Sequence, residues 1–313
     1  MTNTILSTNK TNNSHINGLA PSIDAATRLG VVSYTVADLE RQIAFYQEVL
    51  GFKLHWRGGN QAALGAGKED LLQLTEVRGA KRVRGTTGLY HTAFLVPSRW
   101  ELANLLKRIA ETRTPVEGMS DHYTHLAIYL PDAEGNGIEL AWDFPRDKWE
   151  FFVEELRTKG PGIARQYGGR LNVEELLSEL EQDPTEWTGV ASDTRIGHVH
   201  LHVADLVANR QFYHNVLGFD IKMDSEEAGG TFFSAGGYHH HIGTNVWNGK
   251  GAPRPPADAR GLRHFTVVLP NTSELERLTE RIAQQGVAAE TTEQGLLVRD
   301  PAGNGVLLSV ATR

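Results

Sequence analysis

The chain has 313 residues, of which 40% are hydrophobic and 22% are charged, so it has the composition of a globular protein with material for about two domains. Its formal net charge of −7 argues against a nucleic-acid partner, and no apolar run reaches the roughly 18 residues needed to cross a membrane. Cysteine is absent, so any metal must be bound by His, Asp or Glu, and 13 histidines are present.

Residues 1–27 are rich in Asn, Thr and Ser and contain neither a charged start nor an apolar core. This composition is typical of a disordered tail and not of a signal peptide. We therefore expect a cytoplasmic protein in which the first structural unit begins at residue 28.

The segment after the tail occurs twice. The stretch "RLGVVSYTVADLERQIAFYQEVLGFKL" (residues 28–54) aligns without a gap with "RIGHVHLHVADLVANRQFYHNVLGFDI" (residues 195–221), and about half of the positions are identical. In each copy an alternating apolar stretch leads to Asp-Leu, and an amphipathic helix follows that should end at a Gly such as Gly51. The repeat predicts a duplicated strand–helix unit.

A second pair of segments also repeats. "YHTAFLVPSRWELANLLKRIAE" from Tyr90 and "RHFTVVLPNTSELERLTERIAQ" from Arg263 each predict a strand, a turn and a helix. Each continues to a hairpin whose Gly-Asn-Gly should supply positive φ angles, and Glu134 in the first of these turns is expected to be solvated. The chain thus contains four units of roughly 50 residues, which begin near residues 28, 87, 194 and 261.

The second and third units are separated by an acidic segment, residues 146–193, which predicts a linker with one or two helices. We therefore expect two domains. Residues 28–145 would contain the first and second units, and residues 194–313 the third and fourth.

Polar residues occupy equivalent positions in the four units. The corresponding first-strand residues are Val31, His91, His198 and His264. The corresponding last-strand residues are Gln73, Glu139, His240 and Leu307. Because the first and last strands of such a unit can lie side by side, these residues are candidates for one shared site, which argues against a purely structural role for the repeats.

The motifs "GHVHLHVADL…FYHNVLGF", "DAEGNGIEL", "DPAGNG" and "GGYHHHIG" resemble the vicinal oxygen chelate superfamily and, within it, the bacterial extradiol catechol 2,3-dioxygenases. The resemblance covers about 280 of the 313 residues. It implies an α+β fold of four βαβββ modules that form two domains, with mixed sheets curled into open cups and helices outside. It also implies a divalent metal bound by two His and one Glu from a pair of modules, with a further His and a Tyr beside it.

The fourth module lacks part of this set, because Leu307 stands at the carboxylate position and Leu297 at the tyrosine position. The second module has the complete set in His91, Glu139 and Tyr129.

The resemblance therefore implies a metal site that combines modules two and three, with His91, Glu139 and His198 as ligands. The pairing of modules three and four, with His264 as a ligand, remains the alternative. Two imidazoles and one carboxylate form the facial triad of non-haem Fe(II) oxygenases, so Fe(II) is the expected cofactor, ahead of Mn(II).

Opening a catechol ring requires proton transfer, and an imidazole suits this task near neutral pH. We expect His240 to be this acid–base residue, with His239 and His241 on the opposite face of a strand because side chains alternate along a strand. Tyr129 would donate a hydrogen bond to the substrate, and His122 would be a further imidazole in the pocket.

The expected function is that of an extradiol ring-cleaving dioxygenase. Its expected partners are a small aromatic diol and O2. The sequence leaves the oligomeric state open, and a homo-oligomer is one of the alternatives. The first alternative is a metal enzyme similar to glyoxalases or thiol transferases, which would favour a second carboxylate at the metal. The second is a non-catalytic protein that binds an aromatic ligand. Trp247, Phe232 and Phe233 are candidates to line a pocket for a planar ring.

Overall fold

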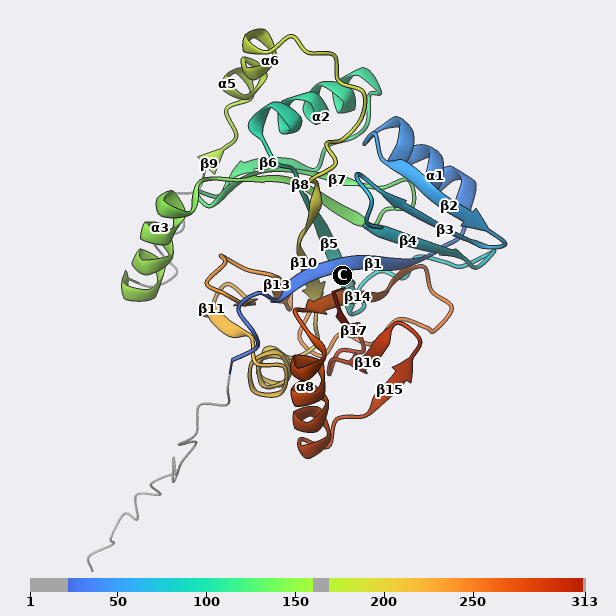
Figure 1. Cartoon of the computed structure of the whole chain (residues 1–313), viewed down its shortest axis with the longest axis vertical. Helices are drawn as coiled ribbons and strands as arrows, with labels where there is room; N and C mark the ends of the chain where they lie inside the picture. The colour runs from blue at the N-terminus through green and yellow to red at the C-terminus, as the bar shows by residue number, and fades with distance from the viewer. Residues whose placement is uncertain (1–21, 160–168, 312–313) are drawn as a thin grey trace, which may run out of the picture.

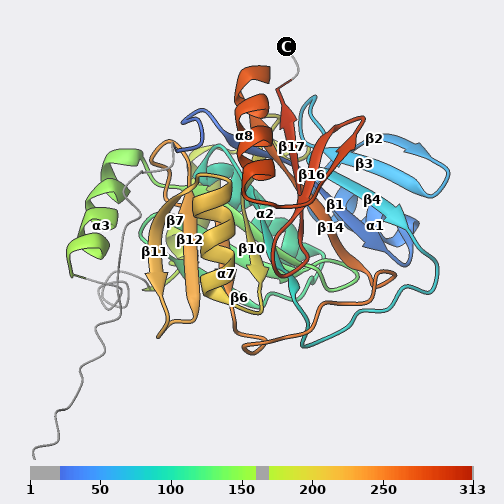
Figure 2. The ribbon, with the colours of Figure 1, turned by 90° about the horizontal axis from the view of Figure 1, so that it is seen from below.

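The computed structural model describes residues 22–159 and 169–311 of the chain. It contains two mixed β-sheets with the longer helices on their outer sides (Figures 1 and 2). The expected α+β class with mixed sheets and outer helices is confirmed.

Each of the four units has the same order of elements, namely a strand, a helical segment and three more strands. The first unit consists of β1 (Arg28–Val36), α1 (Leu39–Glu48), β2 (Lys53–Gly58), β3 (Gln61–Gly65) and β4 (Leu72–Glu76). The second consists of β5 (Gly88–Leu95), α2 (Arg99–Glu111), β6 (Gly118–Asp121), β7 (His125–Pro131) and β8 (Gly137–Asp143). The third consists of β10 (Arg195–His202), α7 (Leu206–Arg210), the π-helical η2 (Gln211–Val216), β11 (Asp220–Ser225), β12 (Gly230–Ser234) and β13 (Ile242–Asn245). The fourth consists of β14 (Gly261–Leu269), α8 (Thr272–Gln284), β15 (Ala289–Thr292), β16 (Gly295–Arg299) and β17 (Gly305–Val310).

The repeated Asp-Leu marks the start of a helix in two units. Asp38 is the N-cap of α1 and accepts a hydrogen bond from the N–H of Arg41. Asp205 caps α7 in the same way and accepts from the N–H groups of Val207 and Ala208. A carboxylate at this position satisfies N–H groups that have no partner inside the helix, which explains why the repeat keeps Asp before Leu.

The Gly-Asn-Gly of each hairpin uses its two glycines differently. Gly135 has a φ of 86°, as the turn requires. Gly137 does not have a positive φ, but a Cβ added there would lie 2.0 Å from the carbonyl oxygen of Tyr90. The expectation of positive φ therefore holds for the first glycine, whereas the second allows β8 to approach β5 closely.

The two sheets do not follow the two halves of the sequence. The eight-stranded sheet has the order β15-β16-β17-β14-β1-β4-β3-β2, so it combines units one and four. The nine-stranded sheet has the order β11-β12-β13-β10-β5-β8-β7-β6-β9, so it combines units three and two. This differs from the expected division into residues 28–145 and 194–313. The first strand of each unit has a free edge that any other unit could pair with, and only tertiary packing selects the partner.

Neighbouring units in the sequence nevertheless contact each other through a helix and a turn. Tyr46 on α1 donates its hydroxyl hydrogen to Asp132 in the β7–β8 turn at 3.2 Å. Tyr213 on η2 makes the equivalent bond to Asp300 at 3.0 Å. All four side chains are buried, so each half of the sequence bridges the two sheets.

Glu134 is not solvated as expected. Its carboxylate accepts hydrogen bonds from the N–H groups of Ala37 and Asp38 at 2.8–3.0 Å, and its side chain lies 3.5 Å from the guanidinium of Arg260. The residue is only 6% exposed. The turn of the second unit packs against the N-terminus of α1, where unpaired N–H groups favour an anion.

Two segments flank or connect the units. Residues 1–21 of the expected tail lie outside the described residues, but Ile23, also assigned to the tail, is buried and donates its N–H to the carbonyl of Gly218 at 2.8 Å. The described part of the linker contains three helices where one or two were expected, together with the short strand β9, which extends the sheet beyond β6. These elements are α3 (Arg146–Lys159), β9 (Gly169–Arg170), α5 (Val173–Leu177) and α6 (Glu179–Gln182).

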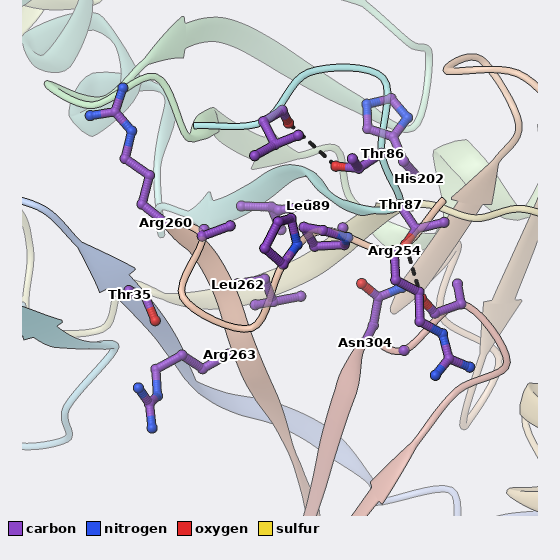
Figure 3. Close-up of a pocket in the computed structure, with 18 of the residues that line it drawn as sticks. Thr35, Thr86, Thr87, Leu89, His202, Arg254, Arg260, Leu262, Arg263 and Asn304 are labelled. Carbon is purple, nitrogen blue, oxygen red and sulfur yellow. Dashed lines mark hydrogen bonds between the residues drawn. The ribbon is translucent and has the colours of Figure 1, made fainter. Parts of the chain in front are cut away.

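A cavity of about 740 Å³ lies where strand ends of both sheets meet two loops, one before β5 and one before β14 (Figure 3). In the described part of the chain, no helix has the length and apolar character that crossing a membrane would demand.

Candidate active site

Strand register places the expected ligands on one face of the nine-stranded sheet. Ala93 on β5 is the neighbour of both His198 on β10 and Glu139 on β8, and His91 is the direct partner of His200. Directly paired residues point to the same side of a sheet, and so do residues two apart on one strand. His91, Glu139 and His198 therefore converge on one side of three adjacent strands.

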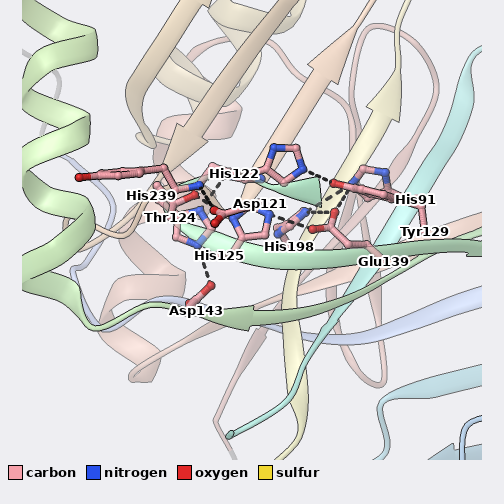
Figure 4. A network of polar contacts seen from close by, with 12 residues as sticks. His91, Asp121, His122, Thr124, His125, Tyr129, Glu139, Asp143, His198 and His239 are labelled. Carbon is pink, nitrogen blue, oxygen red and sulfur yellow. Dashed lines mark hydrogen bonds and ion pairs between the residues drawn. The ribbon is translucent and has the colours of Figure 1, made fainter. Parts of the chain in front are cut away.

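The three side chains meet at a single point (Figure 4). The Nε2 atoms of His91 and His198 each lie 3.0 Å from Oε2 of Glu139, and they are 3.4 Å from each other. The residues are between 1% and 5% exposed. The structure thus brings together the ligand set expected from modules two and three.

This donor set fits a small divalent cation. With bonds of about 2.1 Å, two donors separated by about 90° at the metal lie about 3.0 Å apart, and two separated by about 109° lie about 3.4 Å apart. The measured separations of 3.0, 3.0 and 3.4 Å match this range. The Nδ1 atom of His91 is buried, and no described residue forms a hydrogen bond with it. The direction of the His91 ring, which points Nε2 toward Glu139, is therefore not set by a hydrogen bond at Nδ1.

The charges of the site favour the forms that bind metal. Burial opposes the charge of Glu139, but the nearby imidazoles of His198, His125 and His91 outweigh it and hold the pKa of this carboxyl well below its usual value. Burial lowers the pKa of His198 to about 4, although Glu139 acts in the opposite direction. At neutral pH the site therefore offers a carboxylate and at least one neutral imidazole.

A second cluster contacts the first and was not expected from the sequence. His125 on β7 lies with its Nε2 2.9 Å from Oε1 of Glu139. Its ring is stacked on that of His239 at 5.1 Å, and His239 Nε2 lies 3.0 Å from Asp143, which also accepts a hydrogen bond from Tyr238 at 2.7 Å. In the sequence, only the second histidine of "SDHYTH" pointed to this cluster. No sequence pattern marked Asp143, because its partner His239 is 96 residues away.

Tyr129 and His122 form a pair beside the triad. The Tyr129 hydroxyl lies 2.8 Å from Nε2 of His122, and its ring is 5.5 Å from that of His91. Tyr129 is the direct partner of Glu139 across the β7–β8 ladder, so it faces the same side. Burial raises the pKa of Tyr129 above its usual value and lowers the pKa of His122 to about 4, so both groups are uncharged at neutral pH.

His239, His240 and His241 do not lie on a strand as expected. Gly236 and Gly237 have φ angles of 58° and 75°, which end β12, and β13 begins only at Ile242. Strand alternation therefore does not apply to these histidines. In the ladder, the residue equivalent to Gln73 is Gly243 and not His240.

The turn nevertheless places His240 at the site. Its ring lies 4.1 Å from that of His198 and 4.9 Å from that of Phe232. His239 belongs to the second cluster and is not turned away, which corrects the expected arrangement. His241 faces Ala235, from whose N–H it accepts a hydrogen bond at 3.2 Å.

His264 lies in the other sheet, where the equivalent site is incomplete. Of two small pockets beside it, one is lined by Leu297 and Leu307 and the other by Gln73, and Glu293 in the first is the one carboxylate among their described lining residues. His264 is thus not near the triad, because its strand β14 pairs with β1 and not with β10.

Aromatic side chains adjoin the triad on one side. His200, Tyr90 and Trp247 form a group of rings 5.2–5.3 Å apart, and Phe232 lies 5.4 Å from His200. Tyr90 and Trp247 are partly exposed, at 38% and 54%. Phe233, which was expected to line the pocket, points to the other side and is fully buried in the core.

The family model for the Glyoxalase/Bleomycin resistance protein/Dioxygenase superfamily matches residues 28–140 and 195–308. The chain belongs to this superfamily. The matched ranges are the first and second units and the third and fourth units, so the fourfold repeat belongs to the superfamily. The expected superfamily is therefore confirmed.

Individual relatives agree with this assignment. The chain is 40% identical over 292 residues to the catechol-2,3-dioxygenase of Bacillus subtilis (strain 168), which covers 92% of this chain and 99% of that protein. Two crystal structures share the fold at low identity. A protein of Bacillus subtilis subsp. subtilis str. 168 assigned as a dioxygenase has a TM-score of 0.62 at 13% identity, covering 94% of this chain and 86% of its own. Glyoxalase I of Zea mays has a TM-score of 0.55 at 16% identity, covering 90% and 92%.

Proposed function

We propose that the protein is an extradiol dioxygenase that uses Fe(II), bound by His91, Glu139 and His198, to cleave a catechol ring with O2 next to its hydroxyl groups. The observation that carries the proposal is the convergence of these three buried side chains, two from one half of the sequence and one from the other, within 3.0–3.4 Å. The 40% identity to a protein named catechol-2,3-dioxygenase supports the same reaction.

The donor set suits this chemistry. Two imidazoles and one carboxylate on one face are typical of non-haem Fe(II) oxygenases, and Mn(II) is the second candidate. When bound, the ion would supply adjacent positions for both catechol oxygens and for dioxygen. Only one carboxylate neutralises the ion, so the net positive charge favours an anionic catecholate.

Tyr129 and His122 would assist at the substrate oxygens. The Tyr129 hydroxyl keeps its proton at neutral pH because burial raises its pKa, so it can donate a hydrogen bond to an oxygen of the substrate. His122, 2.8 Å away, orients this hydroxyl.

His240 is the acid–base residue in this proposal. It lies beside His198 and Phe232, and an imidazole there can accept the proton of a catechol hydroxyl and return it later. Tyr90, Trp247 and Phe232 offer ring faces on the open side for a planar substrate.

The test is to purify the protein anaerobically, measure its metal content by mass spectrometry, and measure O2 consumption with catechol. The unaltered protein should contain one Fe per chain and consume O2. Glu139→Ala should lose both, because it removes the carboxylate that both ligand imidazoles contact. The matched control is Glu290→Ala, which removes an exposed carboxylate from β15 in the other sheet and should change neither.

Two results would contradict the proposal in different ways. A metal-bound protein that neither consumes O2 nor cleaves catechol would favour the glyoxalase-like alternative. A protein that binds an aromatic ligand but no metal would favour the non-catalytic one.

A further inference from the structure

The cavity between the two sheets has no role in the proposed reaction. Its volume is about 740 Å³, and its walls come from residues 82–89, 254–257, 259–264, 297, 299 and 302–304, together with strand ends of both sheets (Figure 3). None of the three proposed metal ligands lines it. His202, which does line it, is four residues from His198 along β10, or about 13 Å at the rise of a strand.

The cavity is strongly basic in a chain whose net charge is −7. Among its described lining residues, none is Asp or Glu, and six are arginines: Arg82, Arg84, Arg254, Arg260, Arg263 and Arg299. The charge of the cavity lining is thus opposite in sign to the net charge of the chain.

Among the described residues, most of these guanidinium groups have no anionic partner. Within that part of the chain, Arg254 donates to the carbonyl oxygen of Pro301 and Arg299 to that of Gly303, and neither contacts a carboxylate. Arg260 lies 3.5 Å from Glu134, but that carboxylate is already bonded to the start of α1. The buried Nε atom of Arg260 has no partner among the described residues.

The side chains of Arg82, Arg84 and Arg263 are exposed and form no hydrogen bond or ion pair with any described residue. The positive field also acts on His264, because burial together with Arg263 and Arg299 lowers its pKa to about 4. Like charges held around one cavity repel each other, and a bound anion removes that repulsion.

The walls are held in place by bonds between the loops. Thr87 donates its N–H to Pro253 at 2.9 Å and its hydroxyl hydrogen to Ala302 at 2.9 Å. Asn248 donates to the carbonyl of Thr86 at 2.9 Å. The loop before β5 is therefore tied to the loop before β14 and to the turn before β17, so the cavity is formed before any ligand arrives.

We propose that this cavity binds a small organic polyanion, a molecule with two or more phosphate or carboxylate groups. The guanidinium fork matches either group through two parallel hydrogen bonds. Arginines from three separate segments surround the cavity, so a ligand with several anionic groups can contact more of them than a single anion can. The volume is that of a site for a small molecule.

Titration calorimetry of the full-length protein tests the proposal with two probes, fructose 1,6-bisphosphate for phosphate and benzene-1,3,5-tricarboxylate for carboxylate. One anionic group of either probe can also bind a metal ion at the triad, so only the binding that the arginine variant described below weakens is assigned to the cavity. We expect at least one probe to bind with an affinity that falls as salt is raised. The probe that binds more tightly identifies the anionic group preferred.

The double variant Arg84→Gln/Arg263→Gln should weaken binding at least about tenfold, since each change removes a charged hydrogen-bond donor. Both side chains are exposed, so the variant should fold. The control Lys107→Gln removes an exposed charge from α2, outside the cavity, and should leave the affinity unchanged. No binding of either probe, or equal binding by the double variant, would overturn the proposal. Neither result would affect the proposed dioxygenase activity, which is measured separately.

Discussion

Glu139 is the residue on which the candidate site depends, because among the described residues it alone contacts both imidazoles of the triad and also His125. Its Oε2 atom faces His91 and His198, whereas Oε1 is held by His125. A carboxylate fixed through one oxygen presents the other in a defined direction, which is how neighbours of metal ligands usually act.

His125→Leu should therefore weaken metal binding about 10- to 100-fold, the usual effect of removing a group that orients a ligand. The measurement is a competition titration with a metal-binding dye. His55→Leu is the control, because it breaks a similar pair, His55–Asp70 at 2.7 Å, in the other sheet. Equal affinities in the two variants would show that His125 does not position Glu139.

His240→Phe should keep the metal and lower kcat about 10²- to 10⁴-fold, because it removes the acid–base group and leaves the triad intact. Metal content and kcat for catechol are measured on the same preparations. His241→Phe should cost much less in rate, since His241 faces Ala235 and not the triad. Loss of metal from the His240 variant would instead make His240 a ligand.

At the scale of elements, turns and helix ends connect units that share no sheet. Glu134 in the β7–β8 turn binds the N-terminus of α1, and Tyr46 on α1 binds Asp132 in the same turn. These contacts fix the position of β8, the strand that carries Glu139, relative to the first unit.

Glu134→Ala should lower the free energy of unfolding by about 1–3 kcal/mol, since it leaves partly buried N–H groups and Arg260 without their partner. Urea unfolding measures this change. The metal content of the folded fraction should stay the same, because Glu134 does not contact the triad. Glu111→Ala, which removes an exposed carboxylate from α2, should change the stability by less than about 0.5 kcal/mol. A Glu134 variant as stable as the unaltered protein would show that this capping contact contributes nothing.

At the scale of the whole molecule, the sheets pair the first unit with the fourth and the second with the third. The triad itself is divided, with His91 and Glu139 before the linker and His198 after it. The two halves of the sequence are therefore interdependent for both folding and metal binding.

Fragments 22–159 and 169–311 expressed separately should each fail to unfold cooperatively and fail to bind metal, because each exposes the edges of two half-sheets. Co-expression of the two fragments should restore a complex that binds one metal ion. Circular dichroism and metal analysis test this. A single fragment that binds metal as tightly as the full chain would contradict it.

The sequence determined the features that depend on local patterns. The fourfold repeat, the Asp caps of α1 and α7 and the positive φ of Gly135 were all predictable, because each depends on residues close together in the chain. Comparison of the repeats also singled out His91, Glu139 and His198, since an incomplete fourth unit made Glu139 stand out.

Only the tertiary structure decided the features that depend on distant contacts. The choice of β10 as the partner of β5 is one, since all the first strands offer similar edges. The turn that carries His240 is another, because Gly236 and Gly237 interrupt a segment whose composition alone suggests a strand. The link of Asp143 to His239 spans 96 residues, and the arginine cavity draws on segments about 170 residues apart. Neither leaves a periodic signal in the sequence, since the first arises when units two and three join in one sheet and the second when the two sheets pack together.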